Sequence, residues 1–150
     1  MRTLIQRVST ATVTIDGEPK ASIGPGFLIL LGIESADEAE DVELLCRKVA
    51  QLRVFNDAGG LMNLSLADIN GDIMVISQFT LHASWKKGNR PSFIRAARPE
   101  QAIPLYELFV KKLEELIGKP VATGVFGADM QLALVNDGPV TIIMDSRNKE

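Results

Sequence analysis

The chain has 150 residues, of which 46% are hydrophobic and 23% are charged, and its formal net charge is −3. These values are typical of one globular domain over residues 1–150, exclude a repetitive or disordered protein, and argue against wrapping long nucleic acids, which requires many phosphate contacts. A small contact with one end of an RNA stays compatible with them, whereas no apolar run or signal-peptide pattern suggests a membrane, so we expect a cytoplasmic protein.

The first part of the chain predicts strands followed by a helix. Residues 2–17 alternate in polarity and are rich in Thr and Val, which is typical of two short strands or one bent strand. The continuous apolar run at residues 27–33 has the length of a strand that is buried on both faces. Ser35 and Glu38 resemble a capping box, and apolar residues recur at helical spacing over a first helix of about residues 37–53.

The middle of the chain predicts a second buried strand and a second helix. Residues 72–81 form another strongly apolar run, which leads into a loop with Gly, Asn and Pro at residues 86–92. Pro99 and Pro104 bracket the start of a helix with one apolar face, and Gly118 ends it.

The C-terminal part predicts more strands. Residues 123–145 are typical of two or three strands joined by short turns, and the polar residues 146–150 indicate a frayed tail. The complete order is β-β-β-α-β-α-β-β. It predicts an α/β protein, a single compact domain with mixed β-sheets and two main helices.

One cysteine and one histidine limit the available chemistry. Cys46 cannot form an intramolecular disulfide, and its position near the apolar side of the first helix indicates a buried packing thiol. His82 is conceivable as a general base, but we expect a surface or loop histidine. The sequence therefore predicts no metal site, and it contains no Walker loop, GxGxxG or HExxH motif.

Polar residues follow the second buried strand. Ser77, Gln78 and Thr80 lie at its C-terminal end, where ligands gather in open α/β sheets. The alternative is that their side chains only satisfy backbone groups at a strand end. Nothing in the local sequence activates the hydroxyl of Thr80 as a nucleophile, whereas backbone N–H groups here could stabilise an oxyanion.

The loop that follows holds the densest basic cluster of the chain. Lys86, Lys87 and Arg90 lie close to Phe93. They form either a solvated loop or a contact with RNA phosphates, in which the aromatic ring supplies a stacking surface.

The stretch NDGPVT at residues 136–141 combines two conflicting signals. Asp-Gly between alternating hydrophobic residues is a strong hairpin signal, but Pro139 gives no amide hydrogen to a ladder and fits a simple two-residue turn poorly. Most X–Pro bonds in folded proteins are trans. The sequence therefore leaves open an ordinary loop and a backbone segment held out for a function.

Together, SQFTL at residues 77–81 and NDGPVT at residues 136–141 resemble the two signature motifs of the D-aminoacyl-tRNA deacylase family, also called D-tyrosyl-tRNA deacylases. The resemblance covers nearly the whole chain in the same order. It also includes LIQRV, FLILLGI, MNLSL, RPSF and FGADMQLALVNDGPVT.

The resemblance implies a homodimer with a three-layer fold that acts on the aminoacyl-tRNA 3′ end. Such an enzyme hydrolyses the ester that joins tRNA to a D-amino acid, or to glycine mischarged on tRNA(Ala), and needs no metal or organic cofactor. The Gly138–Pro139 peptide bond would be cis and would enter the partner's active site. Its carbonyl groups would hold the substrate amino group and exclude an L side chain, which is a steric penalty against the wrong enantiomer.

The resemblance also implies roles for individual residues. The backbone of the first motif, Ser77, Gln78, Phe79 and Thr80, would line the pocket for the ester. The rings of Phe79 and Phe126 would contact the terminal adenine, and Arg7 would brace the Gly-Pro segment. The hydroxyl of Thr80 would either take part in the reaction or only shape the pocket, and we favour the second role. The alternatives are a non-catalytic nucleic-acid-binding dimer and a small-ester hydrolase indifferent to RNA.

Overall fold

A computed structural model of the protein describes residues 1–149. The elements in chain order are β1 (Arg2–Ile15), β2 (Glu18–Ile23), β3 (Gly26–Gly32), α1 (Ala39–Ala50), β4 (Phe55–Asn56), β5 (Met62–Leu64), β6 (Asp72–Ser77), the 3-10 helix η1 (Phe79–His82), α2 (Pro99–Ile117), β7 (Ala122–Thr123) and β8 (Gln131–Asp145). The predicted α/β fold with a mixed sheet and two main helices is confirmed.

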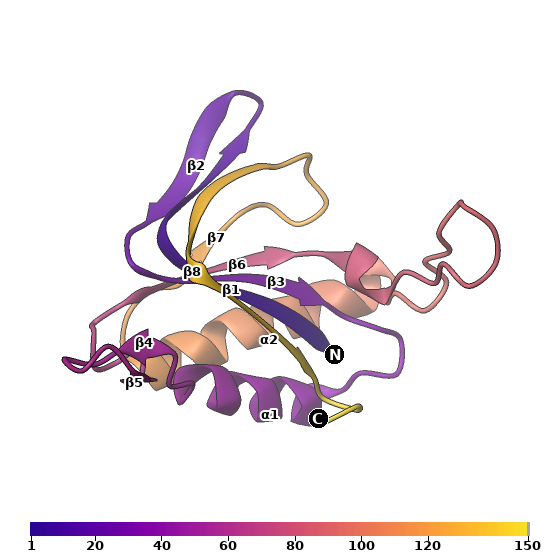
Figure 1. Cartoon of the computed structure of the whole chain (residues 1–150). Helices are drawn as coiled ribbons and strands as arrows, with labels where there is room; N and C mark the ends of the chain where they lie inside the picture. The colour runs from indigo at the N-terminus through magenta and orange to yellow at the C-terminus, as the bar shows by residue number, and fades with distance from the viewer. Residues whose placement is uncertain (150) are drawn as a thin grey trace.

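The main sheet is organised around the long, bent strand β1. Its N-terminal half pairs antiparallel with β3 and its C-terminal half pairs antiparallel with β2, while β8 pairs with β1 along almost its whole length. Strands β3, β6 and β7 run parallel to one another. Figure 1 shows how β2 and the first part of β8 rise away from the helices, which leaves β3 and β6 in the middle of the molecule.

The central strands are apolar on both faces because each face packs on a different cluster. Helices α1 and α2 lie side by side on one face (Figure 1), where they contact Ile29 of β3 and Val75 of β6. The next residues along the same strands, Leu28 and Met74, point to the other face, because side chains alternate along a strand. There they pack with residues of β1, β2 and β8 such as Val13. The molecule thus has three layers.

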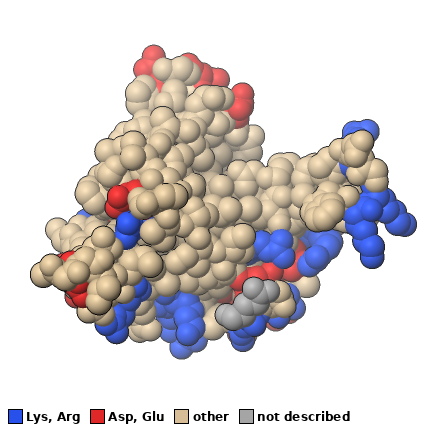
Figure 2. Space-filling model, in the orientation of Figure 1, with Lys and Arg blue, Asp and Glu red and all other residues tan. Residues whose placement is uncertain are grey.

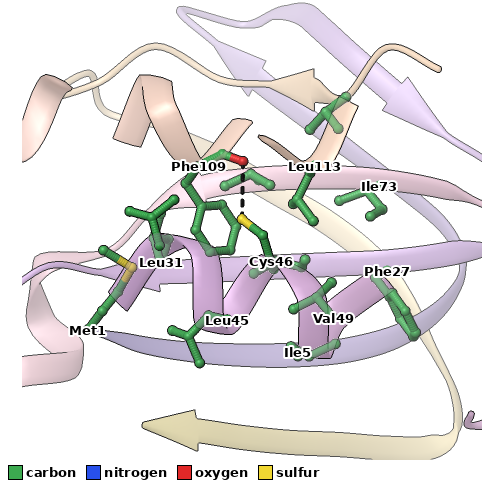
Figure 3. Packing of buried hydrophobic residues seen from close by; sticks show 14 of the residues in the cluster. Met1, Ile5, Phe27, Leu31, Leu45, Cys46, Val49, Ile73, Phe109 and Leu113 are labelled. Atoms are coloured by element: carbon green, nitrogen blue, oxygen red, sulfur yellow. Dashed lines mark hydrogen bonds between the residues drawn. The ribbon is translucent and has the colours of Figure 1, made fainter. Parts of the chain in front are cut away.

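The helix layer holds the only cysteine of the chain. Cys46 lies among Leu45, Val49 and Phe109 in the cluster of Figure 3, and its Sγ donates a hydrogen bond to the Phe109 carbonyl at 3.5 Å. Burial raises the pKa of this thiol to about 12. The predicted packing role is therefore confirmed.

Helix α1 begins later than the sequence pattern suggested. Asp37 is buried, and its Oδ2 accepts the N–H of Glu34 at 2.8 Å, so this carboxylate belongs to the turn before the helix. The capping box consists of Glu38 and Asp41, with the Glu38 N–H donating to Asp41 Oδ2 at 2.9 Å, and does not involve Ser35. The helix spans Ala39–Ala50, shorter at both ends than predicted.

Two other boundaries also differ from the prediction. Strand β6 ends at Ser77: the Gln78 N–H makes the last bond to β3, to Leu31 O at 2.8 Å, and the chain then turns into η1. Residues 131–145 form one long strand, not several, since β1 pairs with both of its ends. NDGPVT is therefore not a hairpin turn.

The segment after β8 is packed on the domain further than expected. We predicted a frayed tail from residue 146, but Ser146 is buried and Arg147 Nε forms an ion pair with Asp37 Oδ1 at 3.3 Å. Glu150 lies outside the described residues. None of the helices within residues 1–149 is long and apolar enough to cross a membrane.

Candidate active site

A cavity of about 290 Å³ opens at the carboxyl ends of the parallel strands β3 and β6. Ser77 and Gln78 line it where β6 ends, and Phe79 lines it at the start of η1. Leu31 of β3 and Leu132 of β8 form part of its wall. Because this edge of an open α/β sheet is where ligands gather, the cavity is the candidate active site.

Two aromatic rings stand at this cavity and are held by others. Phe79 is 56% exposed and packs edge-on against Phe93, with ring centroids 5.1 Å apart. Phe126 makes a similar edge-on contact with Tyr106, with ring centroids 5.9 Å apart. The Tyr106 hydroxyl is anchored by a hydrogen bond that it donates to Val75 O at 2.8 Å. Fixed aromatic faces at the rim of a cavity are suited to stacking on an unpaired base.

Thr80 lies next to the cavity but lacks a base that could activate it. Its Oγ1 accepts a hydrogen bond from the side-chain amide of Gln78, a group that cannot take up a proton. The first N–H groups of a helix have no partner within the helix, so the N–H groups of Phe79 and Thr80 are available as donors at the start of η1. The main chain here is better suited to chemistry than the hydroxyl.

The second motif forms a bulge in the middle of β8. Gln6 pairs with Thr141 and Val8 pairs with Asn136, so that the single residue Arg7 on β1 lies opposite residues 137–140 of β8. Three extra residues must therefore leave the plane of the sheet.

The Gly138–Pro139 peptide lies in this bulge. Its bond is cis, and both of its residues are exposed. The φ of Gly138 is 123°, a value that residues with a Cβ rarely adopt.

The side chain of Arg7 braces this bulge. It is buried, and its Nε donates to Asp137 O at 3.1 Å and lies 3.2 Å from Asp137 Oδ2. Its Nη1 donates to Val54 O at 2.6 Å and to Asn56 Oδ1 at 3.3 Å. One guanidinium group thus connects the bulge to the segment that enters β4.

Asn136 closes the base of the bulge, a role that the sequence analysis missed. Its Oδ1 accepts the N–H of Val140 at 3.2 Å, and its Nδ2 donates to Thr141 Oγ1 at 3.0 Å. An Asn directly before Asp-Gly is a known turn signal, but its bonds here span four and five residues, which local sequence does not reveal.

Within one chain the two motifs lie apart. Ser77, Gln78, Phe79 and Phe126 come together around the cavity, whereas Arg7, Gly138 and Pro139 do not line it. Leu132 lines the cavity, and Gly138 follows six residues later, which corresponds to about 20 Å of extended strand.

The sequence profile of the family described as D-Tyr-tRNA(Tyr) deacylase matches residues 4–145. The chain belongs to this family. It is 59% identical over 150 residues to a D-aminoacyl-tRNA deacylase from Bacteroides thetaiotaomicron, and 62% identical over 150 residues to one from Akkermansia muciniphila. In both cases the comparison covers 100% of each chain.

Two solved structures share the fold of this chain. A protein described as c-Myc DNA Unwinding Element Binding Protein is 40% identical, with a TM-score of 0.90 over 97% of this chain and 98% of its own. A probable eukaryotic D-amino acid tRNA deacylase reaches a TM-score of 0.82 over 95% and 97% of the two chains, and its 16% identity bears on the fold alone.

His82 differs from the expected surface histidine. It is 3% exposed, and neither ring nitrogen makes a hydrogen bond of good geometry. Burial lowers its pKa below the ordinary value, against the opposing effects of the Gly32 backbone and the Glu34 carboxylate. His82 does not line the candidate active site, so its buried ring has no evident part in the reaction there.

Proposed function

We propose that this protein hydrolyses the ester between a D-amino acid, or glycine, and the 3′ end of tRNA. The observation that carries the proposal is the separation of the two motifs. The first motif lines a cavity, while the second is an exposed, braced bulge that does not line that cavity. Membership of the deacylase family supports the same reaction.

A homodimer would bring the two motifs together. Alternate residues of β8 remain exposed in both halves of the strand, and they include the apolar Val135 at 57% before the bulge and Ile143 at 65% after it. Large apolar side chains left exposed on a strand favour a covering partner. In a two-fold dimer the same surface contacts itself, so each bulge can reach the partner's cavity.

In the proposed filter, the main chain reads the configuration of the substrate. Carbonyl groups of the Gly138–Pro139 segment from the partner would accept hydrogen bonds from the substrate amino group. The space left beside them would admit a D side chain or the hydrogen of glycine, and an L side chain would clash. Such a filter tolerates many D-residues, because it does not contact the side chain that it admits.

The chemistry would depend on main-chain donors and on the substrate. Water adds to the ester carbonyl carbon, the bond from that carbon to the ribose oxygen breaks, and the ribose oxygen leaves with a proton. The N–H groups of Phe79 and Thr80 would stabilise the oxyanion, and the terminal 2′-hydroxyl would assist the water. Thr80 would shape the pocket. The reaction as proposed takes place in the cytoplasm and requires no metal or organic cofactor.

Deacylation rates of one tRNA charged with D-tyrosine, L-tyrosine or glycine test this proposal. We expect rapid loss of the D-tyrosyl and glycyl esters and sparing of the L-tyrosyl ester. Equal rates on both tyrosyl esters would reject the filter, and absence of turnover on all three would reject the reaction. A D-tyrosine ester without tRNA should react slowly; fast turnover of it would favour a small-ester hydrolase.

A second candidate function is binding of nucleic acid without catalysis. It is favoured by the similarity to the c-Myc DNA Unwinding Element Binding Protein and by the basic loop around Lys86 and Arg90. Tight duplex DNA binding that weakens steeply with salt, combined with no turnover of D-tyrosyl-tRNA, would favour this alternative.

A further inference from the structure

A second cavity lies at the other end of η1 from the candidate active site. It has a volume of about 340 Å³, and its lining includes Arg2, His82, Trp85, Lys86 and Arg95. The cavity thus joins the N-terminal end of β1 to the loop that projects from the body of the molecule after η1 (Figure 1). We call it the His82 cavity.

The ring of His82, which lines the cavity, makes no hydrogen bond of good geometry. Nδ1 and Nε2 of His82 are both buried and lack such a bond to any described residue, although the Gly32 backbone beside the ring acts to raise its pKa. Buried polar atoms are normally hydrogen-bonded, so two such atoms on one ring require an explanation. A neutral imidazole keeps one N–H, which can donate to an oxygen atom of a ligand.

The charges around the cavity favour an anion. Arg2 pairs with Asp145 at 2.8 Å, and Arg95 pairs with Glu34 at 2.6 Å, so these two arginines are already balanced. Lys86 forms no ion pair within the described residues and leaves the cavity with an excess positive charge. Figure 2 shows basic side chains on the projecting arm without acidic ones beside them on this face.

The same loop carries an exposed aromatic ring. The ring belongs to Trp85, which is 81% exposed and lies directly before Lys86 in the chain. An indole face that stands in solvent next to a cation is a stacking platform for an unpaired base, and stacking of this kind does not depend on the base sequence. The ligand suggested by both features is a single-stranded nucleic acid.

We propose that the His82 cavity binds a backbone phosphate of the single-stranded 3′ end of an RNA, with Lys86 contacting the phosphate, His82 donating to it and Trp85 stacking on a neighbouring base. This inference rests on the proposed function for the identity of the RNA. A 3-10 helix rises by about 2 Å per residue, so Phe79 and His82 lie roughly 6 Å apart along η1. That distance corresponds to roughly two nucleotides of a stacked strand, at about 3.4 Å each. The phosphate would belong to one of the two nucleotides before the terminal adenosine.

Binding of an uncharged RNA hairpin with a single-stranded 3′ extension tests the subsite. Fluorescence anisotropy would compare the unmodified protein with Lys86→Gln, with Lys87→Gln, whose residue does not line the cavity, and with Lys111→Gln on the exposed side of α2. We expect Lys86→Gln to weaken binding about fivefold and to reduce the salt slope by about 0.7, as for one phosphate contact. Lys111→Gln should leave binding unchanged. Equal weakening by Lys86→Gln and Lys87→Gln would overturn the subsite in favour of diffuse loop charge.

His82 gives a direct readout because it is the only histidine of the chain. We expect its imidazole NMR signals to shift when the hairpin binds, and to shift much less when the 3′ extension is removed. Unchanged signals at saturating RNA would overturn the proposal. So would signals that respond to inorganic phosphate and not to RNA, since they would identify a site for free phosphate.

Kinetics separate a failure of this inference from a failure of the proposed function. With D-tyrosyl-tRNA, Lys86→Gln should raise KM about fivefold and leave kcat unchanged, because the contact is the same in the ground and transition states. Turnover with an unchanged KM would overturn the subsite alone. No turnover by the unmodified protein, with Lys86-dependent RNA binding and a shifted His82 signal, would reject the hydrolase and support the subsite.

Discussion

Gly138 is the residue at which one added methyl group has the most direct effect. A Cβ there would lie 2.9 Å from Arg7 Nη2 and 2.9 Å from Val140 Cγ2, at a φ of 123°. We expect Gly138→Ala to displace the bulge and to reduce deacylation of D-tyrosyl-tRNA at least about tenfold, at a cost of about 1–3 kcal/mol in the free energy of unfolding. Rates and urea unfolding measure both effects.

Gly17 provides the matched control for this substitution. It also has a positive φ, of 80°, but a Cβ there meets no atom within 4 Å. Gly17→Ala should therefore lower stability by about 1 kcal/mol and leave the rate unchanged. If both variants kept full activity, the bulge would not take part in the reaction.

Thr80 is predicted to be dispensable for the chemical step. Its hydroxyl accepts from the Gln78 amide and has no base beside it, so Thr80→Ala should keep deacylation within about tenfold of the unmodified rate. Single-turnover rates with D-tyrosyl-tRNA measure this. A loss of about a thousandfold with intact folding would assign the hydroxyl a chemical role.

His82 makes stability depend on pH. Its pKa is lowered by burial, and by Arg2 and the N-terminal ammonium, while the Gly32 backbone and Glu34 raise it. The unfolded chain therefore binds this proton more readily, so its contribution to stability is present above the ordinary pKa of about 6.5 and is lost as pH falls through the folded value. His82→Gln should flatten the dependence of the unfolding free energy on pH below 7. Equal slopes for both proteins in urea titrations would contradict this.

At the scale of elements, the helix layer depends on residues that face the sheet. Leu113 of α2 is completely buried, whereas Leu116, one turn later, is 48% exposed. Leu113→Ala should lower the free energy of unfolding by about 2–5 kcal/mol, because it leaves a cavity between the helices and the sheet. Leu116→Ala should change it by about 0.5 kcal/mol. Similar losses in urea unfolding would mean that the helix is packed differently.

Elements with strong local patterns were predicted from the sequence. The run at residues 27–33 became β3, and the proline and glycine signals gave α2 its ends at Pro99 and Ile117. Strand β8 could not be predicted in this way, because its register is set by pairing with β1 more than 100 residues away. That pairing overrides the local Asp-Gly signal for a hairpin and makes the segment, which the sequence left open between a loop and a held-out backbone, a bulge within one strand.

The candidate site was predicted only in part for a similar reason. Ser77, Gln78 and Phe79 follow an apolar run, and their place at a cavity could be inferred from the strand end alone. The braces of Arg7 and Asn136 join segments distant in sequence or span an irregular bulge, so no spacing rule reveals them. The burial of His82 depends on β1 and β3 packing around η1, which is equally invisible to local pattern.

At the scale of the whole molecule, activity should require two chains. Placing charges at exposed positions in both halves of β8 with Val135→Glu and Ile143→Glu should convert a dimer into monomers, because an unpaired carboxylate is costly to bury. Activity should be lost together with dimerisation. Light scattering after gel filtration measures the state, and Leu116→Glu, on α2, is the control. A fully active monomer would contradict the shared site.

Mixing two variants, each impaired in a different motif, gives a sharper test of the shared site. A chain with Gly138→Ala keeps its cavity, and a chain with Phe79→Ala keeps its bulge. If each site combines the cavity of one chain with the bulge of the other, a mixed dimer contains one intact site, and activity should reappear after the two chains are unfolded and refolded together. No recovery, despite formation of mixed dimers, would place both motifs in the same chain's site.

Cys46 has a consequence for the behaviour of the protein under oxidation. The thiolate is the form that reacts with peroxides and alkylating reagents, and a buried thiol with a pKa of about 12 supplies almost none of it at neutral pH. We therefore expect the native protein to resist oxidation in the absence of a reducing agent. Because Cys46 is buried between α1 and α2, we expect its modification by iodoacetamide to follow local opening of the helix layer, so that the rate of modification reports on this opening.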